Sequence, residues 1–283
     1  MSARFRHSLV ASTTAAVALI AGLATSTLAA AAESPTLAEV IAAPHRTPAF
    51  VARDVWRHPL ETLGFFGVKP TDTVVEIWPG GGGWYTEILA PYLRDHGRYV
   101  AAIQPVSLPQ TDDYARRGAE RFKAKLAANP AIYDRTEVSE FRPPERADTV
   151  PADTADVVLT FRNVHNWIEG GFEAAAFEAF YMMLKPGGTL GVVEHRAKPG
   201  TSREQSIDSG YVTEAYIRAL AYSAGFELAG SSPVNNNPND SKDYPEGVWT
   251  LPPVLRLKDV DREKYLAIGE SDRMTFKFVK PKR

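Results

Sequence analysis

Short apolar runs alternate with amphipathic segments along most of the chain. The apolar runs are rich in β-branched residues and have the length of buried strands, whereas the segments between them repeat apolar residues at helical spacing. This alternation predicts an α/β fold with a doubly wound, mostly parallel sheet, whose ligands bind beyond the carboxyl ends of the strands. The predicted strands are residues 73–77, 98–103, 136–141, 156–161, 189–194, 227–234 and 274–279, and the predicted helices are residues 84–93, 112–128, 172–184 and 213–224.

Two segments lie outside this alternation. Residues 36–66 have helical patterning interrupted by prolines, which predicts a helical N-terminal lead-in made of several pieces. Residues 235–272 are rich in Asn, Pro and Asp and form a long insertion before the last strand. This insertion is either an ordered embellishment that covers the site or a surface loop.

The N-terminus has the pattern of a secretory signal. Arg4 and Arg6 precede an alanine-rich apolar run over residues 9–24, and an A-x-A cleavage site follows at residues 30–32. An uncleaved membrane anchor is the alternative. We predict a signal peptide over residues 1–32, a single mature domain over residues 33–283, and a periplasmic or secreted protein without stable membrane insertion after cleavage. The signal is of the Sec type because no Arg-Arg pair is present.

Charge and composition narrow the class of ligand. The formal net charge of −2 removes the simplest electrostatic case for binding nucleic acid or an anionic membrane. The absence of cysteine excludes disulfides, thiolate metal sites and cysteine nucleophiles. A small-molecule ligand is therefore expected.

The strongest local signal is a glycine-rich turn between the strand at 73–77 and the helix at 84–93. Four consecutive glycines let the backbone approach a ligand closely, and the start of the helix offers free N–H groups. Glu76, at the strand end, could accept hydrogen bonds from a ligand's amino or hydroxyl groups. The alternative is a tight turn without a ligand.

Three segments together resemble class I S-adenosylmethionine-dependent methyltransferases. Residues 76–82 (EIWPGGG) resemble the first motif of the family, residues 184–190 (LKPGGTL) the loop before the fifth strand, and residues 224–226 (AGF) the segment before the sixth. More narrowly, residues 78–86 resemble a group of exported bacterial proteins called predicted methyltransferases. The resemblance implies a Rossmann-like, seven-stranded sheet with an antiparallel last strand at 274–279, and S-adenosylmethionine as the cofactor.

The resemblance also implies which residues bind the cofactor. Trp78 stands where the family usually has glycine, so its indole could fill part of the pocket or stack on the ligand. Gln104 stands where the family usually has an acidic residue for the ribose hydroxyls. The predicted cofactor-binding residues are Glu76, Trp78, Gly80, Gly82, Gly83, Gln104 and Asn163.

Two histidines follow predicted strands and are the candidate catalytic residues. His165, in the loop after the fourth strand, could act as a general base, or be a hydrogen-bonded structural residue. His195, at the end of the fifth strand, could be a second acid or base, or belong to a strand-end ion pair. A two-histidine metal site completed by Glu194 or Asp208 is a further alternative, but no local ligand spacing supports it, so no metal is predicted.

Segments near both termini could close the site. Arg53 lies in the helical lead-in, together with Trp56 and His58. Residues 269–273, just before the last strand, either cap the pocket or form a turn with paired charges.

The leading functional hypothesis is an enzyme that transfers a methyl group from S-adenosylmethionine to a small acceptor in the cell envelope. The alternative is a non-catalytic periplasmic small-molecule-binding protein on the same fold, with Trp78, Trp84 and Trp167 lining its pocket. A nicotinamide oxidoreductase is disfavoured because no acidic ribose-binding residue follows Ile103.

Overall fold

A seven-stranded sheet runs through the centre of the protein in the order β3-β2-β1-β4-β5-β7-β6. All neighbouring strands are parallel except β7, which is antiparallel to both β5 and β6. The predicted doubly wound, mostly parallel sheet with an antiparallel last strand is thus confirmed. The strands are β1 (Thr73–Ile77), β2 (Arg98–Ile103), β3 (Glu137–Glu140), β4 (Ala155–Phe161), β5 (Leu184–His195), β6 (Glu227–Ser232) and β7 (Arg273–Val279).

The computed structural model describes residues 1–2, 34–109 and 111–282. The predicted signal peptide lies almost entirely outside the described residues, as does its cleavage site. Residues Ser34–Arg283 form one structural unit. None of the helices in the described part of the chain has the length and apolar character needed to span a bilayer.

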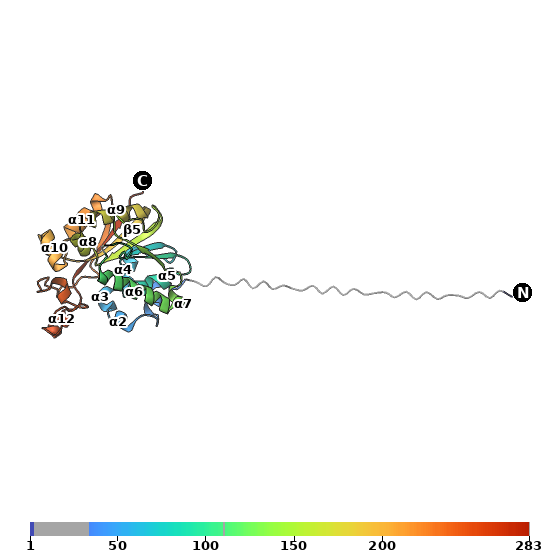
Figure 1. Ribbon diagram of the computed structural model, residues 1–283, viewed down its shortest axis with the longest axis horizontal. Coiled ribbons are helices and arrows are strands. Elements are labelled where there is room, and N and C mark those ends of the chain that lie inside the picture. The colour runs from blue at the N-terminus through green and yellow to red at the C-terminus, as the bar shows by residue number, and fades with distance from the viewer. Residues whose placement is uncertain (3–33, 110, 283) are drawn as a thin grey trace. The chain divides into compact units, whose positions relative to one another are not determined.

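Helices cover both faces of the sheet (Figure 1). On one face, α8, α9 and α11 bury Trp167, Phe177 and Phe180 in an apolar core; on the other, α4 and α5 bury Phe66 and Ile88 in a second core. Burial on both faces explains why the central strands are continuous apolar runs. The helices between β1 and β6 are α5 (Thr86–Leu93), α6 (Asp113–Ala128), α7 (Pro130–Tyr133), α8 (Val164–Gly170), α9 (Glu173–Met183), α10 (Arg203–Ser209) and α11 (Glu214–Ser223).

The helical lead-in is present and is divided as its prolines predict. Its four short helices are α1 (Leu37–Ala42), α2 (Pro48–Val51), α3 (Asp54–Arg57) and α4 (Pro59–Phe66). Pro48 and Pro59 each occupy the first turn of a helix, where proline's missing N–H is tolerated. Gly67 ends α4 in a left-handed conformation, with φ of 79°.

Two predicted segments differ from the structure by more than two residues. β5 begins at Leu184 rather than Thr189. Leu184 pairs with Ala155 and Thr189 pairs with Val157, so the Lys-Pro-Gly-Gly segment between them forms an irregularity within the strand. The segment after β4 was expected to be a loop, but Val164–Gly170 forms α8. Its buried residues Val164, Trp167 and Ile168 have helical spacing, although polar neighbours mask that pattern.

The insertion before β7 is ordered over much of its length. It contains a 3-10 helix, η1 (Gly247–Thr250), and α12 (Arg262–Ile268). Buried polar groups hold it to the domain: the Asp240 carboxylate accepts from the Tyr211 hydroxyl at 3.0 Å and from the Asp272 N–H at 2.7 Å. These hydrogen bonds join the two ends of the insertion to each other and to Tyr211, between α10 and α11.

Candidate functional site

A cavity of about 440 Å³ lies beyond the carboxyl ends of the central strands. Trp78 follows β1, Gln104 follows β2, Asn163 follows β4 and His195 ends β5, and all four line the cavity. β1 and β4 are the neighbours between which the strand order reverses, which is where open α/β sheets bind their ligands. The topology therefore places this cavity at the expected position for a ligand site.

The glycine turn forms one wall of the cavity. Gly80 has φ of 71°, and a Cβ built there would meet nothing within 4 Å, so this position opens onto free space. In contrast, a Cβ on Gly82 would lie 2.9 Å from the Phe50 ring, and one on Gly81 would lie 3.0 Å from the Arg121 side chain. Gly81 and Gly82 therefore allow α2 and α6 to pack closely on the turn, whereas Gly80 faces the cavity.

The backbone N–H groups of the turn are largely free. The Gly83 N–H donates to the Gly80 carbonyl at 3.2 Å, but within the described residues the N–H groups of Gly81 and Gly82 have no hydrogen-bond acceptor. Free N–H groups just before a helix form a binding site for an anionic or polar ligand group. The turn retains this capacity even though the protein packs on two of its glycines.

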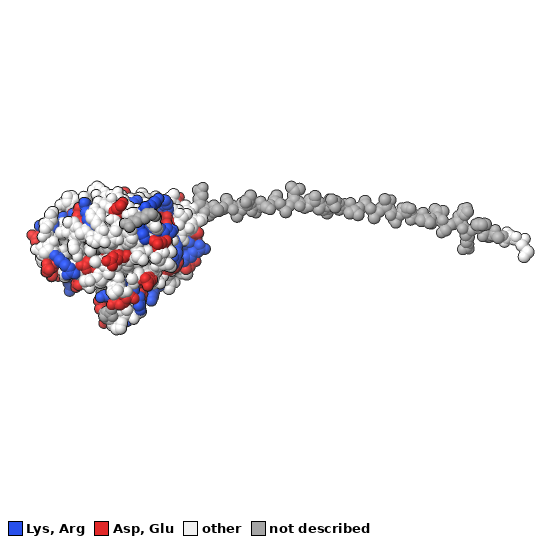
Figure 2. Space-filling model, turned by 90° about the horizontal axis from the view of Figure 1, so that it is seen from above, with Lys and Arg blue, Asp and Glu red and all other residues white. Residues whose placement is uncertain are grey.

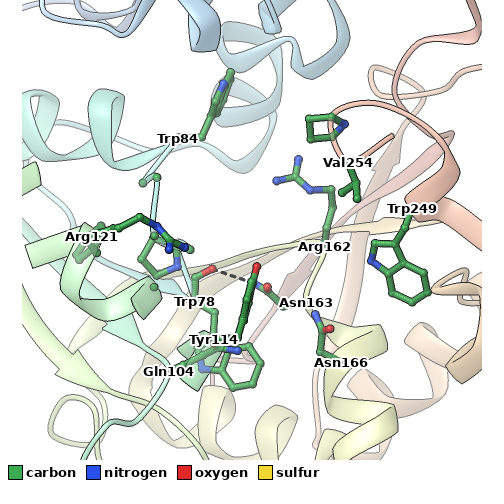
Figure 3. A pocket seen from close by; sticks show the side chains of 18 of the residues that line it. Trp78, Trp84, Gln104, Tyr114, Arg121, Arg162, Asn163, Asn166, Trp249 and Val254 are labelled. Atoms are coloured by element: carbon green, nitrogen blue, oxygen red, sulfur yellow. Dashed lines mark hydrogen bonds between the residues drawn. The ribbon is translucent and has the colours of Figure 1, made fainter. Parts of the chain in front are cut away.

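Trp78 has a left-handed backbone, with φ of 51°, a conformation that favours glycine. Its indole N–H donates to the Phe141 carbonyl at 2.8 Å, and its ring packs edge-on against Trp167 with the ring centroids 5.9 Å apart. The indole is therefore fixed toward the end of β3. Figure 3 shows Trp78 near Gln104 and Tyr114, at the opposite end of the cavity from Trp249 and Val254.

Glu76 is buried beneath the turn and does not line the cavity. Its carboxylate accepts from the Tyr99 hydroxyl at 2.5 Å, and the Thr86 hydroxyl lies 3.5 Å away. Burial raises the pKa of Glu76 to about 7, although the hydrogen bonds from Tyr99 and Thr86 oppose that shift. In this position the carboxyl group supports the turn from below.

Asn163 ties β4 to β1 at the edge of the cavity. Its side-chain N–H group donates to the Ile77 carbonyl at 2.8 Å, and the Trp78 carbonyl lies 3.4 Å away. Figure 3 shows the contact between Asn163 and Trp78 beside Tyr114. Tyr114 is an exposed residue on α6 that was not predicted from the sequence. The sequence of α6 has the pattern of a polar surface helix, so it does not indicate that the first turn of this helix faces a ligand site.

His165 lies on α8, with its Nδ1 atom 3.1 Å from the Glu194 carboxylate. Glu194 is fully buried and also accepts the Val164 N–H at 2.6 Å. A carboxylate only accepts hydrogen bonds, so the hydrogen of this pair belongs to Nδ1 and the imidazole Nε2 is left as an acceptor. The Glu194–His165 pair thus has the arrangement of an oriented general base.

The two predicted catalytic histidines come together in the cavity, with ring centroids 5.3 Å apart. The Nδ1 atom of His195 lies 2.5 Å from the Ser271 hydroxyl. Burial lowers the pKa of His195 well below its ordinary value, and the charges of His165 and Arg162 lower it further. His195 is therefore a neutral imidazole at neutral pH and a weak base, suited to hydrogen bonding.

The same residues could also place three metal-ligand atoms together. The ligand atoms of His165, Glu194 and His195 all lie within 4.8 Å of one another, whereas Asp208, the other carboxylate considered, lies exposed on α10. Both His165 Nδ1 and Glu194 are already engaged with each other. Nearby guanidinium groups repel a cation, so the arrangement favours proton transfer over metal binding.

Segments far from the central sheet complete the cavity. Arg53 and Phe50 reach it from the lead-in, and Glu270 and Ser271 reach it from the turn before β7. From the insertion, the residues that line the cavity are Val248, Trp249, Pro252, Pro253 and Val254. The insertion therefore forms part of the cavity wall. Trp56 does not line the cavity and instead lies against Gly269, where an added Cβ would meet its ring at 2.3 Å.

Comparison with known proteins identifies the fold. No family model and no curated protein sequence matches the chain. Among solved structures, a SAM-dependent methyltransferase from Aquifex aeolicus is similar, with TM-score 0.51 and 14% identity over 87% of this chain and 98% of the other. A protein described as a candidate sarcosine dimethylglycine methyltransferase, from Galdieria sulphuraria, has TM-score 0.53 and 12% identity over 84% of this chain and 91% of the other.

A third similar structure has a different described activity. The [4+2]-cyclase SpnF has TM-score 0.52 and 14% identity, with 80% of each chain covered. Together these similarities show that the chain has the fold of class I SAM-dependent methyltransferases. Because the identities are low and a cyclase shares the fold, the chemistry has to be argued from the cavity.

Proposed function

We propose that this protein is a S-adenosylmethionine-dependent methyltransferase that acts on a small-molecule acceptor in the cell envelope. The observation that carries the proposal is the cavity itself. It combines the open position at Gly80, two free backbone N–H groups and an oriented histidine at the strand ends of a methyltransferase fold.

The residues of the cavity suit the parts of this cofactor. The free N–H groups of Gly81 and Gly82 can donate hydrogen bonds to the carboxylate at the amino-acid end. Gln104 can hydrogen-bond the ribose hydroxyls, and the exposed ring of Tyr114 provides a flat surface for stacking on a purine. Trp78 limits the space toward β3 because its indole is held by the Phe141 carbonyl.

When bound, the cofactor supplies a methyl group on a positively charged sulfur, and transfer depends mainly on positioning the acceptor. The chain's own contribution is to hold the acceptor and remove its proton. His165 can take that proton at Nε2, because Glu194 holds the hydrogen of Nδ1 and stabilises the imidazolium that forms. His195 is neutral beside it and can orient the same acceptor group by a hydrogen bond.

A non-catalytic binding protein is the second candidate, and one observation favours it. Phe50 and Arg121 pack on Gly82 and Gly81, so two of the glycines are explained by contacts within the protein. In that case the same cavity would hold a small molecule against Trp78, Trp84 and Trp249 without chemistry. Trp167, which was expected in this wall, is instead buried in the apolar core. Binding of the cofactor product separates the two candidates.

The test is a calorimetric titration with S-adenosylhomocysteine. We expect saturable binding by the wild type and none by Gly80→Val, because the branched side chain would project into the cavity from a left-handed backbone position. Gly200→Val is the matched control: Gly200 has φ of 85° and open space around its Cβ position, but it lies outside the cavity. Absence of heat from the folded wild type at millimolar ligand would contradict the proposal.

The location in the cell envelope rests on the N-terminal pattern of residues 1–32. The mass of the exported protein tests it, since cleavage would leave a chain that begins at Glu33. An intact N-terminus on the isolated protein would contradict this part of the proposal.

A further inference from the structure

Four guanidinium groups surround a single carboxylate at one side of the cavity. The Nε atoms of Arg53 and Arg57 lie 2.7 Å and 3.1 Å from the Glu270 oxygens. Arg273 contributes an Nη1 atom at 2.9 Å, and Arg162 a more distant one at 4.0 Å. We call these five residues the arginine cluster. Glu270, Arg57 and Arg273 are buried, so the centre of the cluster is screened from bulk water.

The arginine cluster has an excess of three positive charges, because four guanidinium groups share one carboxylate. Neighbouring buried carboxylates do not compensate it. Glu194 is engaged with His165 and the backbone of α8. Asp272 pairs with Arg196 at 2.9 Å and with Lys242 at 2.9 Å.

Uncompensated charge of this kind is unfavourable away from water. Burial lowers the pKa of Arg57 well below its ordinary value, and the charge of Arg162 lowers it further. Burial alone would raise the pKa of Glu270, but the surrounding guanidinium groups hold it well below its ordinary value. The Nη2 atom of Arg53 is buried without a hydrogen-bond partner. An anionic ligand would relieve this repulsion and satisfy this donor.

The cluster opens onto the cavity beside the two histidines. Arg53, Arg57 and Arg162 line the cavity. Figure 3 shows Arg162 pointing into the space between Trp84 and Val254, away from Gln104 and Tyr114. Along the chain, Arg162 is three residues before His165, and Glu270 precedes Ser271, which contacts His195. A group bound by the arginine cluster would therefore lie next to the candidate proton acceptors.

We infer that the arginine cluster binds the carboxylate or phosphate group of the methyl acceptor, so that the acceptor is a small organic acid or phosphate ester. Guanidinium groups suit this role because their planar N–H donors match both oxyanions. The assignment to the acceptor rests on the proposed methyltransferase function. The anion site itself rests only on the contacts of the arginine cluster.

Inorganic phosphate is the probe, and its affinity is measured from the rise in melting temperature at constant ionic strength. We expect Arg162→Gln to weaken phosphate binding about tenfold, the usual effect of losing one hydrogen bond to a charged group. This variant should fold, because Arg162 is the most distant of the four arginines and Glu270 keeps its three close partners. Arg53→Gln provides a second, independent variant.

Arg121→Gln is the matched control. Arg121 lines the same cavity but lies beside Gly81, outside the arginine cluster, so its loss should leave phosphate affinity unchanged. Equal phosphate affinity in the wild type, Arg162→Gln and Arg53→Gln would overturn the anion site. An equal loss of phosphate affinity in Arg121→Gln would show that phosphate responds only to the overall positive charge of the cavity. That result would also overturn the anion site.

A competition experiment identifies the source of the anionic group. If the group belongs to the acceptor, phosphate should still bind when S-adenosylhomocysteine is saturating. Competition by S-adenosylhomocysteine but not by 5′-methylthioadenosine, which lacks the amino-acid end, would assign the site to the cofactor's own carboxylate and overturn the acceptor assignment. If neither nucleoside binds, the proposed function fails, while the phosphate titrations still decide whether the arginine cluster binds anions.

Discussion

Glu76 shows how one side chain can support a site without facing it. It lies at the end of β1 directly under the glycine turn, and it is fully enclosed with Tyr99 and Thr86. Its buried position explains the shift of its pKa to about 7. The stability of the turn, and hence of the cavity wall, is therefore coupled to pH.

The pH dependence has a definite sign. Because the folded-state pKa of Glu76 is about 7 against an ordinary value of 4.5, the stability it contributes is present below pH 4.5 and is lost as pH rises through about 7. We expect the free energy of unfolding of the wild type to fall by about 3 kcal/mol over this range relative to Glu76→Gln. Urea unfolding at a series of pH values measures this difference. Parallel pH profiles for the two proteins would show that the carboxyl group is not strained by burial.

The sequence could predict the position of some residues of the cavity but not of others. Trp78, Gly80 and His165 line the cavity, because each follows a strand whose carboxyl end is set by the hydrophobic pattern, and their roles in binding and catalysis stay predictions. Glu76 also lies near a strand end, but its side chain points below the turn toward Tyr99 and not into the cavity. The hydrophobic periodicity could not show which of these two directions the side chain takes. The hydrogen bond between His165 and Glu194 joins the start of α8, just after β4, to the end of β5, and their relative height depends on the register of β4 and β5.

At the scale of elements, the lead-in is fastened to the central domain by a buried carboxylate. Glu87 on α5 accepts the Thr47 N–H at 2.9 Å and the Thr47 hydroxyl at 2.6 Å, just before α2 begins. It also forms an ion pair with Lys125 on α6. Since α2 carries Phe50 onto Gly82, this single carboxylate helps to hold the cavity wall in place.

We expect Glu87→Ala to lower the free energy of unfolding by about 3 kcal/mol, because it removes one partner of a buried ion pair and two hydrogen bonds. Glu120→Ala is the matched control. Glu120 is an exposed glutamate on α6, so the loss of its carboxylate should change the free energy of unfolding little. Urea unfolding measures both variants. An equal loss in the Glu120 variant would contradict the assignment of Glu87 as the anchor.

Elements were predictable where burial imposes a simple pattern. The central strands, buried on both faces, were found from apolar runs, and the division of the lead-in into helices from the prolines that interrupt its pattern. The helix α8 was missed because polar residues for the cavity interrupt its short apolar stripe. The insertion also could not be assigned, since its order depends on buried hydrogen bonds between distant residues such as Asp240 and Tyr211.

At the scale of the whole molecule, the cavity is assembled from both ends of the domain. The sheet contributes the strand ends, the lead-in contributes Arg53 and Arg57, and the insertion contributes Trp249. No local motif could predict the arginine cluster, because it joins three segments, at residues 53–57, 162 and 270–273, that are more than a hundred residues apart and meet only after folding. Positive charge gathers there although the surface in Figure 2 intersperses both signs and the full chain has a net charge of −2.

The measurement that tests the central claim most directly is a nuclear magnetic resonance titration of the protein labelled with ¹⁵N at glycine only. The account predicts that S-adenosylhomocysteine moves the amide signals of Gly80, Gly81 and Gly82, whereas the signals of Gly200 and Gly225, outside the cavity, stay in place. Binding that leaves the three turn signals unchanged would place the ligand elsewhere and contradict the account.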